Sequence, residues 1–220
     1  MRLVFASNNA HKLEEIRAIM PAGIEVLSLH DIGFEQEIEE TGLTLAENSR
    51  IKASTVAAFI NDGMSASLND GMMIDGVFAD DTGLEIDALG GEPGVYTARW
   101  YRMENGAERV QDAALQVKGE KEIFAANRAK ALRELSGKTN RGAQFKTIIT
   151  LIRIAKNETV QVEGIVRGRI ATEEYGQGGF GYDPIFIPEG YDKTFGELPA
   201  DIKNSISHRA RAMEALVKIL

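Results

Sequence analysis

The sequence predicts an α/β layer fold. The chain opens with an apolar run at 2–6, a polar turn, apolar residues at helical spacing over 13–20, and a second apolar run at 24–29. Residues 144–155 carry Ile, Thr and Leu on both faces, as a central strand does, and 160–170 are expected to pair with them. Strands and helices that alternate in this way are typical of a sheet covered by helices.

Local signals place the other elements. Pro21 and Gly23 end the first helix. Thr44 and Glu47 form a capping-box pattern, which predicts a helix from there to about Ile60. The remaining expectations are an acidic loop at 32–41, an exposed hairpin or loop at Asn61–Gly76, strands at 72–79 and 84–88, a turn at 90–94, helices at 108–117 and 122–135, and a closing helix at Ser207–Leu220.

Length and composition limit the classes of function. The 220 residues suffice for a single domain, 1–220, arranged as two lobes about a cleft. The formal net charge of −8 argues against a nucleic-acid partner, because phosphate backbones are bound mainly by clustered Lys and Arg. A small polyanion needs only a local basic pocket or a metal ion. The absence of cysteine excludes disulfides, thiolate zinc sites and cysteine nucleophiles.

The sequence also bears on location. It has no apolar segment long enough to span a bilayer, and Met1 leads directly into a strand-like run without the features of a secretory leader. We therefore expect a cytoplasmic protein with no membrane partner. With only three histidines in the chain, a metal site built from several histidines is not expected.

A glycine-rich stretch at 176–184 is the most distinctive segment. Four glycines in the six positions 176–181 leave the backbone bare, so that a flat ligand can lie against it. Phe180 and Tyr182 offer ring faces for stacking, and Asp183 offers a charged acceptor. The alternative is a tight turn between strands whose aromatic rings belong to the core.

The first turn has the position of a phosphate site. It links a strand to a helix N-terminus, where unpaired N–H groups and the helix dipole favour an anion. Its residues are Ser7, Asn8, Asn9, Ala10, His11 and Lys12, and Lys12 adds a positive charge. It is not a Walker A loop, since residues 7–12 contain no Gly-Lys-Ser/Thr. The alternative is an ordinary helix cap.

Paired carboxylates suggest a cation site. Asp80 and Asp81 follow the apolar residues 77–79, at what reads as a strand end. Adjacent carboxylates repel each other, so a cation or a shared proton is expected nearby. Glu39 and Glu40 form a second acidic pair, and Mg²⁺ suits such oxygen ligands. The alternative is that the two aspartates are turn residues before Gly83.

Three basic residues lie at the start of the last expected helix, and all could face an anion: Lys203, His208 and Arg209. His208 and Arg209 are sequence neighbours, so an ideal helix points them about 100° apart. Both could reach one ligand only if it sits over the helix end. The alternative is a solvated helix start.

Six motifs, taken together and in their order along the chain, are specific enough to indicate a protein family. They are Ser-x-Asn-x-x-Lys, Glu-Glu-Thr-Gly, Ala-Asp-Asp-Thr-Gly-Leu, Leu-Gly-Gly-x-Pro-Gly, Gly-Gly-Phe-Gly-Tyr-Asp-Pro-Ile-Phe and Ser-His-Arg. From Leu3 to the last helix, the chain resembles the inosine triphosphate pyrophosphatase family, the HAM1-like non-canonical purine NTP pyrophosphatases. The resemblance implies Mg²⁺-dependent hydrolysis of ITP, dITP and XTP to the monophosphate and pyrophosphate, which cleanses the nucleotide pool. It also implies a long, twisted mixed sheet with helical lobes flanking a central substrate cleft, and a homodimer.

The resemblance implies residue roles as well. Residues 7–12 match the phosphate-binding turn, and Asp81 matches the catalytic base and metal ligand, with Asp80 beside it. Glu39 matches a metal-side glutamate. The matching substrate contacts are Thr82, the base-binding segment Phe180, Gly181, Tyr182 and Asp183, and the residues Lys203, His208 and Arg209. Backbone N–H groups of 178–181 could pair with the 6-oxo group of hypoxanthine or xanthine, which adenine lacks.

Three departures from the family pattern stand out. Asn8 replaces a usual glycine, Gln177 replaces a usual threonine, and the segment Asn61–Gly76 is longer than the norm. Two other functions are alternatives to the hypothesis of a purine NTP pyrophosphatase. One is a nucleotide sensor without catalysis, which the acidic residues disfavour. The other is a pyrimidine-directed enzyme of the related Maf-like type, which the Phe-Gly-Tyr-Asp-Pro and Ser-His-Arg motifs disfavour.

Overall fold

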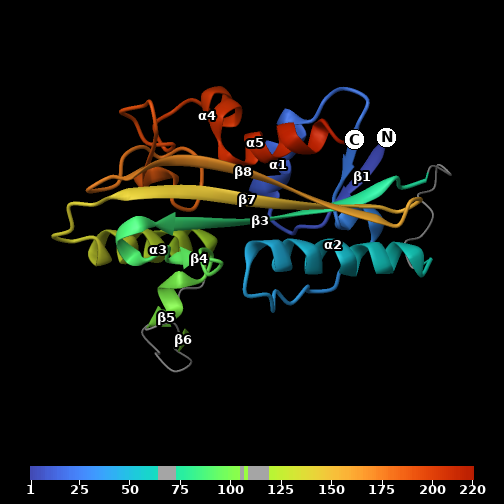
Figure 1. Ribbon diagram of the computed structural model, residues 1–220, viewed down its shortest axis with the longest axis horizontal. Helices are drawn as coiled ribbons and strands as arrows, with labels where there is room; N and C mark the ends of the chain where they lie inside the picture. Colours follow the sequence, from blue (N-terminus) through green and yellow to red (C-terminus); the bar gives the residue numbers. More distant parts are fainter. Residues whose placement is uncertain (64–72, 105–106, 109–118) are drawn as a thin grey trace. The chain divides into compact units, whose positions relative to one another are not determined.

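The computed structural model describes residues 1–63, 73–104, 107–108 and 119–220 (Figure 1). Three long strands dominate it: β3 (Gly76–Ile86), β7 (Gly142–Arg153) and β8 (Glu158–Ile170). The short strands are β1 (Arg2–Phe5), β2 (Glu25–Leu27), β4 (Pro93–Gly94), β5 (Met103–Glu104), β6 (Ala107–Glu108) and β9 (Phe186–Pro188). The α-helices are α1 (Ala10–Ile19), α2 (Leu45–Asn61), α3 (Glu120–Glu134), α4 (Ala200–Ile206) and α5 (His208–Val217).

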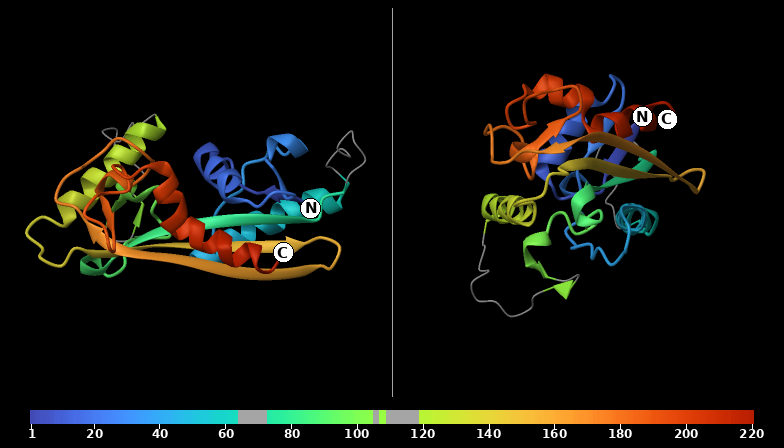
Figure 2. Two further views of the ribbon diagram at one scale, coloured as in Figure 1. Left: turned by 90° about the horizontal axis from the view of Figure 1, so that it is seen from above. Right: turned by 60° about the vertical axis from the view of Figure 1, so that its left-hand side comes forward.

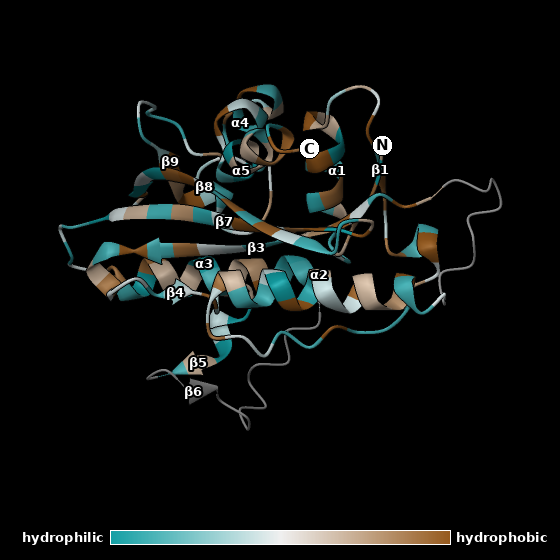
Figure 3. Cartoon of the chain, turned by 45° about the vertical axis from the view of Figure 1, so that its right-hand side comes forward, coloured by the Kyte–Doolittle hydropathy of each residue, from teal (hydrophilic) through white to brown (hydrophobic). Residues whose placement is uncertain are grey.

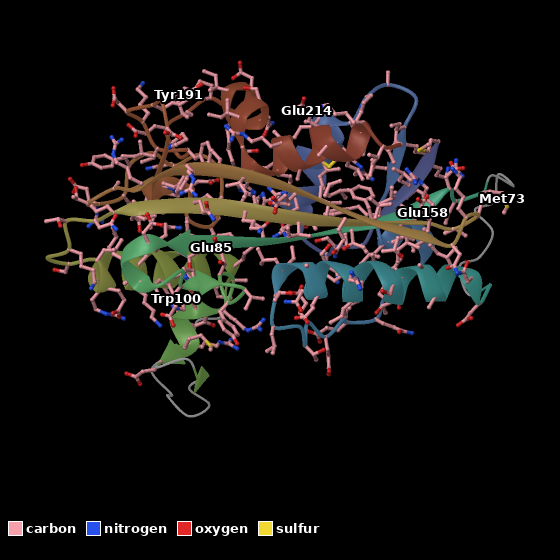
Figure 4. All side chains as sticks on the ribbon, viewed as in Figure 1. Met73, Glu85, Trp100, Glu158, Tyr191 and Glu214 are labelled. Carbon is pink, nitrogen blue, oxygen red and sulfur yellow. The ribbon has the colours of Figure 1, made fainter. Side chains whose placement is uncertain are left out.

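The main sheet is mixed. Its strand order is β2-β1-β3-β7-β8-β9, with β4 paired to β3. Strand β1 runs parallel to both β2 and β3, whereas β8 and β9 are antiparallel. Along β3 and β7, Thr82 meets Thr147 while Glu85 (Figure 4) meets Gln144, so these two strands are also antiparallel. The mixed α/β fold expected from the sequence is confirmed.

The chain divides into two compact units, and β3, β7 and β8 each contribute to both. Unit 1 comprises residues 1–82, 147–165 and 207–220, and unit 2 comprises 83–146 and 166–206. The described residues of unit 2 form one apolar core, which includes Trp100, Phe145 and Phe186. Unit 1 has two cores, one on each face of its part of the sheet. Helix α2 covers one of these faces, and α1 and α5 cover the other (Figures 1 and 2).

Helix α2 forms where its sequence predicts. Thr44 Oγ1 accepts from the Glu47 N–H while the Glu47 carboxylate accepts from the Thr44 N–H, a complete capping box. The helix alternates between hydrophobic and hydrophilic residues, as expected for a helix with one buried face (Figure 3). On the other face of the sheet, α5 lies directly on β8 because Gly164 has no side chain. A Cβ there would come within 2.1 Å of the His208 carbonyl oxygen.

Three expectations are wrong in detail. The strands expected at 72–79 and 84–88 form one strand, β3, with Asp80–Gly83 inside it. Charge does not end this strand because both aspartates are paired with cations. Lys203 lies on α4 and not on the last helix, since Ser207 caps a separate α5. The strand expected at 24–29 is shorter and spans Glu25–Leu27.

Two expectations fall mostly outside the described residues. The helix expected at 108–117 lies there except for Glu108, which belongs to β6. Of the hairpin or loop expected at Asn61–Gly76, residues 64–72 lie there as well. Within the described part of the chain, every helix falls short of the length and apolar character that a bilayer span requires.

Candidate active site

The parallel pairing of β1 and β3 brings the first turn next to Asp80. Phe5 is in register with Phe78, and the Ala6 N–H donates to the Phe78 carbonyl at 2.8 Å. Strand β1 then ends while β3 continues, so the turn at 7–12 follows the carboxyl end of β1 beside Asp80. Asn9 caps α1, because its Oδ1 accepts from the Lys12 N–H at 3.0 Å. The pairing of β1 and β3 therefore brings Lys12 next to Asp80, which is 68 residues away in the sequence.

Asp80 is fully buried and engaged through both oxygens. Lys12 Nζ lies 2.9 Å from Oδ1, and Arg209 Nε lies 3.3 Å from Oδ2. Arg209 is itself buried and also pairs with Glu15. Burial would raise the pKa of Asp80, but the charges of Lys12 and Arg209 outweigh it and hold that pKa well below the usual range. At neutral pH Asp80 is therefore an ionised anchor for Lys12 and Arg209.

Asp81 is buried but only half satisfied. Its Oδ1 accepts from Lys52 Nζ at 3.1 Å, while its buried Oδ2 has no hydrogen-bond partner among the described residues. Burial raises the pKa of Asp81 by more than the charges of Lys52 and Lys12 lower it. A carboxylate with one uncommitted oxygen and a raised pKa is a better base, and it can also ligate a metal.

The two aspartates face opposite sides of the sheet. Successive side chains on a strand alternate, and the contacts follow this rule. Asp80 meets Lys12 of α1 and Arg209 of α5, whereas Asp81 meets Lys52 of α2. The cation expected near the pair is present on both faces of the sheet. Each aspartate has its own cationic partners.

Lys52 links Asp81 to the acidic loop. Its Nζ lies 3.0 Å from Glu40 Oε1. Burial lowers the pKa of Lys52, but the charges of Asp81, Glu40 and Asp80 outweigh burial and raise that pKa. Sequence reasoning passed over Lys52. The signal that could have found it is a lysine on the buried face of α2, one turn from Ser49 and Val56.

The acidic loop is held by Asn48, another residue that sequence reasoning missed. Its Oδ1 accepts from the Gly42 N–H at 2.8 Å. A Cβ on Gly42 would lie 2.6 Å from that same oxygen, so only glycine allows this approach. Asn48 thus fixes the loop that carries Glu39 and Glu40, of which Glu39 is exposed and Glu40 contacts Lys52.

Thr82 begins a chain of hydroxyl contacts in unit 1. Its Oγ1 lies 3.3 Å from Asp80 Oδ2 and 2.8 Å from Thr147 Oγ1. Thr147, also missed from sequence, is fully buried, and its Oγ1 lies 2.6 Å from His208 Nδ1. Thr82, His208 and Arg209 are thereby joined to Asp80 in one network.

In unit 2, Asp183 folds the glycine-rich loop. Its Oδ2 accepts from the Phe180 N–H and from Lys203 Nζ, each at 2.7 Å. Gly179 has a φ of +70°, and a Cβ there would lie 2.0 Å from that carboxylate oxygen, so glycine is required. The buried pair of Asp183 and Lys203 is a clamp within the loop.

The same clamp positions the Phe180 ring. Lys203 Nζ lies 4.9 Å from the ring centroid, and the Phe124 ring lies 6.1 Å away. The Gly181 carbonyl accepts from Arg128 at 2.9 Å. Tyr182, in contrast, packs in the unit 2 core, and its hydroxyl donates to the Thr97 carbonyl. Burial raises the pKa of that hydroxyl.

Comparisons with known proteins place the whole chain in one family. The family model described as the Ham1 family matches residues 3–219. The chain belongs to the Ham1 family. A dITP/XTP pyrophosphatase of Flavobacterium johnsoniae is 42% identical over 100% of this chain and 98% of its own. One of Bacillus subtilis is 43% identical over 99% and 96% of the two chains. The solved structure of the Staphylococcus aureus Ham1 protein aligns with a TM-score of 0.76 at 35% identity, covering 100% and 97%.

One departure of this Ham1-family chain from the expected pattern has a structural explanation. Among the described residues other than glycine, only Asn157 has a positive φ. The first turn therefore does not place Asn8 in the left-handed region, and glycine is not needed there. In the glycine-rich loop, two N–H groups are already used internally: that of Gly178 donates to the Gly196 carbonyl, and that of Phe180 donates to Asp183. These two N–H groups are not available to the 6-oxo group of a purine. Of the four residues expected to offer such donors, Gly179 and Gly181 remain.

The residues that could hold a metal ion lie around Asp81. The described residues contain no group of three or more Asp, Glu or His side chains that could hold a metal ion by themselves. Mg²⁺ commonly uses one or two carboxylates together with substrate phosphates and water. The uncommitted, buried Oδ2 of Asp81 fits that pattern. The donor set of this family member is thus compatible with Mg²⁺.

Proposed function

We propose that the protein hydrolyses the purine nucleoside triphosphates dITP, ITP and XTP to the nucleoside monophosphate and pyrophosphate. Membership of the Ham1 family and relatives named dITP/XTP pyrophosphatases support the reaction. The single structural observation that carries the proposal is the asymmetry of the paired aspartates. Asp80 is locked between cations, while Asp81 keeps one buried oxygen uncommitted.

A triphosphate would meet positive charge on unit 1. The N-terminal turn of α1, residues 7–12, offers the dipole of a helix start, and Lys12 supplies an ammonium group. Burial lowers the pKa of Lys12 more than Asp80 raises it. The incoming phosphates would therefore stabilise the protonated form of Lys12. The remaining proposed substrate contacts on this unit, not assigned to the phosphates in particular, are Thr82, His208 and Arg209.

Asp81 is the proposed general base. Its raised pKa brings it closer to neutrality, which favours proton abstraction from an attacking water. Lys52, on the other oxygen, holds the carboxylate in place. Mg²⁺, which Asp81 would hold with Glu39 and with Asp80 nearby, would neutralise phosphate charge and polarise the scissile phosphoanhydride. Since Asp80 is already saturated with cations, we place Asp81 first among these ligands.

On unit 2, Phe180, Gly181, Tyr182, Asp183 and Lys203 remain the proposed base-recognition residues. Phe180 would stack on the purine, and Asp183 with Lys203 would hold the ring in position. Tyr182 would act from the core by supporting the loop. The proposal further comprises one functional domain over residues 1–220, a homodimer and a cytoplasmic location, where nucleotide pools are used.

A nucleotide panel tests the function. The protein is incubated with Mg²⁺ and with ITP, dITP, XTP, ATP or GTP, and the products are separated. We expect monophosphate and pyrophosphate from the first three. ATP carries a 6-amino donor in place of the 6-oxo acceptor, and unpaired buried polar groups can discriminate by about 10⁴-fold. Inosine diphosphate with orthophosphate as first products, or equal rates on ATP, would refute the proposal.

A further inference from the structure

Three side chains connect the buried Asp80 carboxylate to the imidazole of His208. Thr82 Oγ1 lies 3.3 Å from Asp80 Oδ2, Thr82 Oγ1 lies 2.8 Å from Thr147 Oγ1, and Thr147 Oγ1 lies 2.6 Å from His208 Nδ1. All four residues belong to unit 1. Asp80 and Thr147 are fully buried, and His208 is 5% exposed. The four polar groups therefore satisfy one another away from bulk water.

The direction of the protons along this chain follows from its Asp80 end. Both Asp80 oxygens accept from cationic donors, Oδ1 from Lys12 Nζ and Oδ2 from Arg209 Nε, and a carboxylate paired in this way accepts hydrogen bonds and does not donate them. The Thr82 hydroxyl must therefore donate to Asp80. A hydroxyl has a single proton, so Thr82 then accepts from Thr147. The single hydroxyl proton of Thr147 is used in its bond to Thr82, so Thr147 can only accept a hydrogen bond from His208 Nδ1.

We infer that Thr82 and Thr147 form a hydroxyl wire that sets the tautomer of His208, with the proton on Nδ1 and the lone pair on Nε2. Thr147 is thus a positioning residue that acts through His208. The usual preference of a neutral imidazole does not decide the tautomer here, because the hydrogen bond at one nitrogen fixes the role of the other.

The consequence for substrate binding rests on the proposed function. In this tautomer Nε2 of His208 is an acceptor, which pairs with an N–H or O–H donor and repels phosphate oxygens. Arg209, the next residue, points into the Asp80 and Glu15 pairs and has the opposite character. The two neighbours of the Ser-His-Arg motif would therefore contribute one acceptor and one cation, with Asp80 as their common anchor.

The histidine spectrum tests this inference directly. Two-bond ¹H–¹⁵N correlations of the ¹⁵N-labelled protein at neutral pH distinguish the tautomers, since protonated and unprotonated ring nitrogens resonate far apart. The chain has only three histidines, His11, His30 and His208, so His11→Gln and His30→Gln assign the signals. We expect His208 to carry its proton on Nδ1. A proton on Nε2 alone, or on both nitrogens, overturns the inference.

Matched variants test the part played by Thr147. Thr147→Val keeps the shape but removes the hydroxyl, and we expect the Nδ1–H preference to be lost. We also expect kcat/KM for ITP to fall by about tenfold to hundredfold, by analogy with the loss of a hydrogen-bond partner that orients a metal-bound histidine. Thr147→Ser restores the hydroxyl and should restore the tautomer. Thr150→Val removes another buried hydroxyl of β7, bonded to Ser49 and Gln161, and should leave the His208 spectrum unchanged.

An unchanged tautomer and unchanged kinetics in Thr147→Val would overturn the role of Thr147. If this variant does not fold, the wild-type spectrum still decides the tautomer, and Thr147→Ala removes the same hydroxyl with a smaller side chain. The spectrum requires neither substrate nor turnover. A failure of the nucleotide panel would therefore refute the proposed activity without altering the result for His208.

Discussion

Asp80 and Asp81 are neighbours on one strand, yet the two faces of the sheet give them different properties. On the α1 and α5 face, Asp80 is saturated by Lys12, Arg209 and Thr82. On the α2 face, Asp81 contacts Lys52 through one oxygen only. The pKa of Asp80 is lowered and the pKa of Asp81 is raised, although burial acts on both in the same direction.

The difference shows that the number of cationic partners decides whether an aspartate at this site stabilises the fold or remains reactive. Asp80 contributes to stability because its charge is neutralised on both sides. Asp81 is held in a less satisfied state, which costs stability and leaves a reactive carboxylate. The experiments below ask whether the two faces can be perturbed separately, in order of decreasing expected effect.

Metal removal should act on activity and not on the fold. If Asp81 is the principal Mg²⁺ ligand, excess EDTA should abolish ITP hydrolysis and added Mg²⁺ should restore it, because Mg²⁺ prefers carboxylates and substrate phosphates. The thermal melting temperature should hardly change, since the Asp80 anchor needs no metal. Full activity in excess chelator would count decisively against a metal-dependent mechanism.

Asp80→Asn should act mainly on stability. The change leaves Lys12 and Arg209 buried beside a neutral amide, and breaking a buried ion pair in this way costs about 3–5 kcal/mol in the free energy of unfolding. Urea unfolding measures the loss. Glu214→Gln, which removes an exposed carboxylate of α5 (Figure 4) paired with Lys218, is the matched control and should show no measurable change. Equal stability of Asp80→Asn and the control would show that the anchor is not structural.

The same pair of proteins gives a pH test. The pKa of Asp80 is lower in the folded state than in the unfolded state, so its stabilisation is present above the unfolded value and is lost as the pH falls through the folded value. The stability gap between wild type and Asp80→Asn should therefore be full at neutral pH and shrink below about pH 4, the unfolded aspartate range. A gap that widens on acidification would contradict the assignment.

Asp81→Asn should act mainly on turnover. It keeps the shape but removes the basic oxygen, so kcat for ITP should fall at least about a hundredfold, or about 2.7 kcal/mol, the low end for a lost general base. Because the pKa of Asp81 is raised in the folded state, the ionised carboxylate does not stabilise the protein at neutral pH, and unfolding should be little changed. Near-normal turnover would redirect attention to Glu39 or Asp80.

Phe180→Ala extends the comparison to unit 2. Stacking of a base on an aromatic ring contributes about 1–3 kcal/mol, and ITP binding should weaken by that amount. Binding can be measured in the Asp81→Asn background, where turnover does not interfere. Phe180→Leu keeps an apolar side chain and isolates the contribution of the ring. Loss of stability with intact affinity would instead make Phe180 a core residue, packed with Phe124 and Lys203.

Much of the fold and many candidate site residues could be predicted because their signals are local. The capping box of Thr44 and Glu47, the Asn9 cap and the apolar face of α2 involve residues three or four positions apart. The glycine-rich loop is also locally encoded, since Asp183 closes it onto Phe180 three residues away. Such patterns act through the covalent geometry of a short segment, and they do not depend on the rest of the chain.

Other features were decided only by the tertiary structure. From sequence, Asp80–Gly83 resembles a strand end, because two adjacent charges are costly inside a sheet. The strand continues since Arg209, 129 residues away, and Lys12, 68 residues away, neutralise Asp80, while Lys52 pairs with Asp81 on the other face. Thr147 joins the site 61 residues from His208. The sequence alone thus determined which residues can ionise or donate a hydrogen bond, and long-range packing decided which of them are satisfied and which remain reactive.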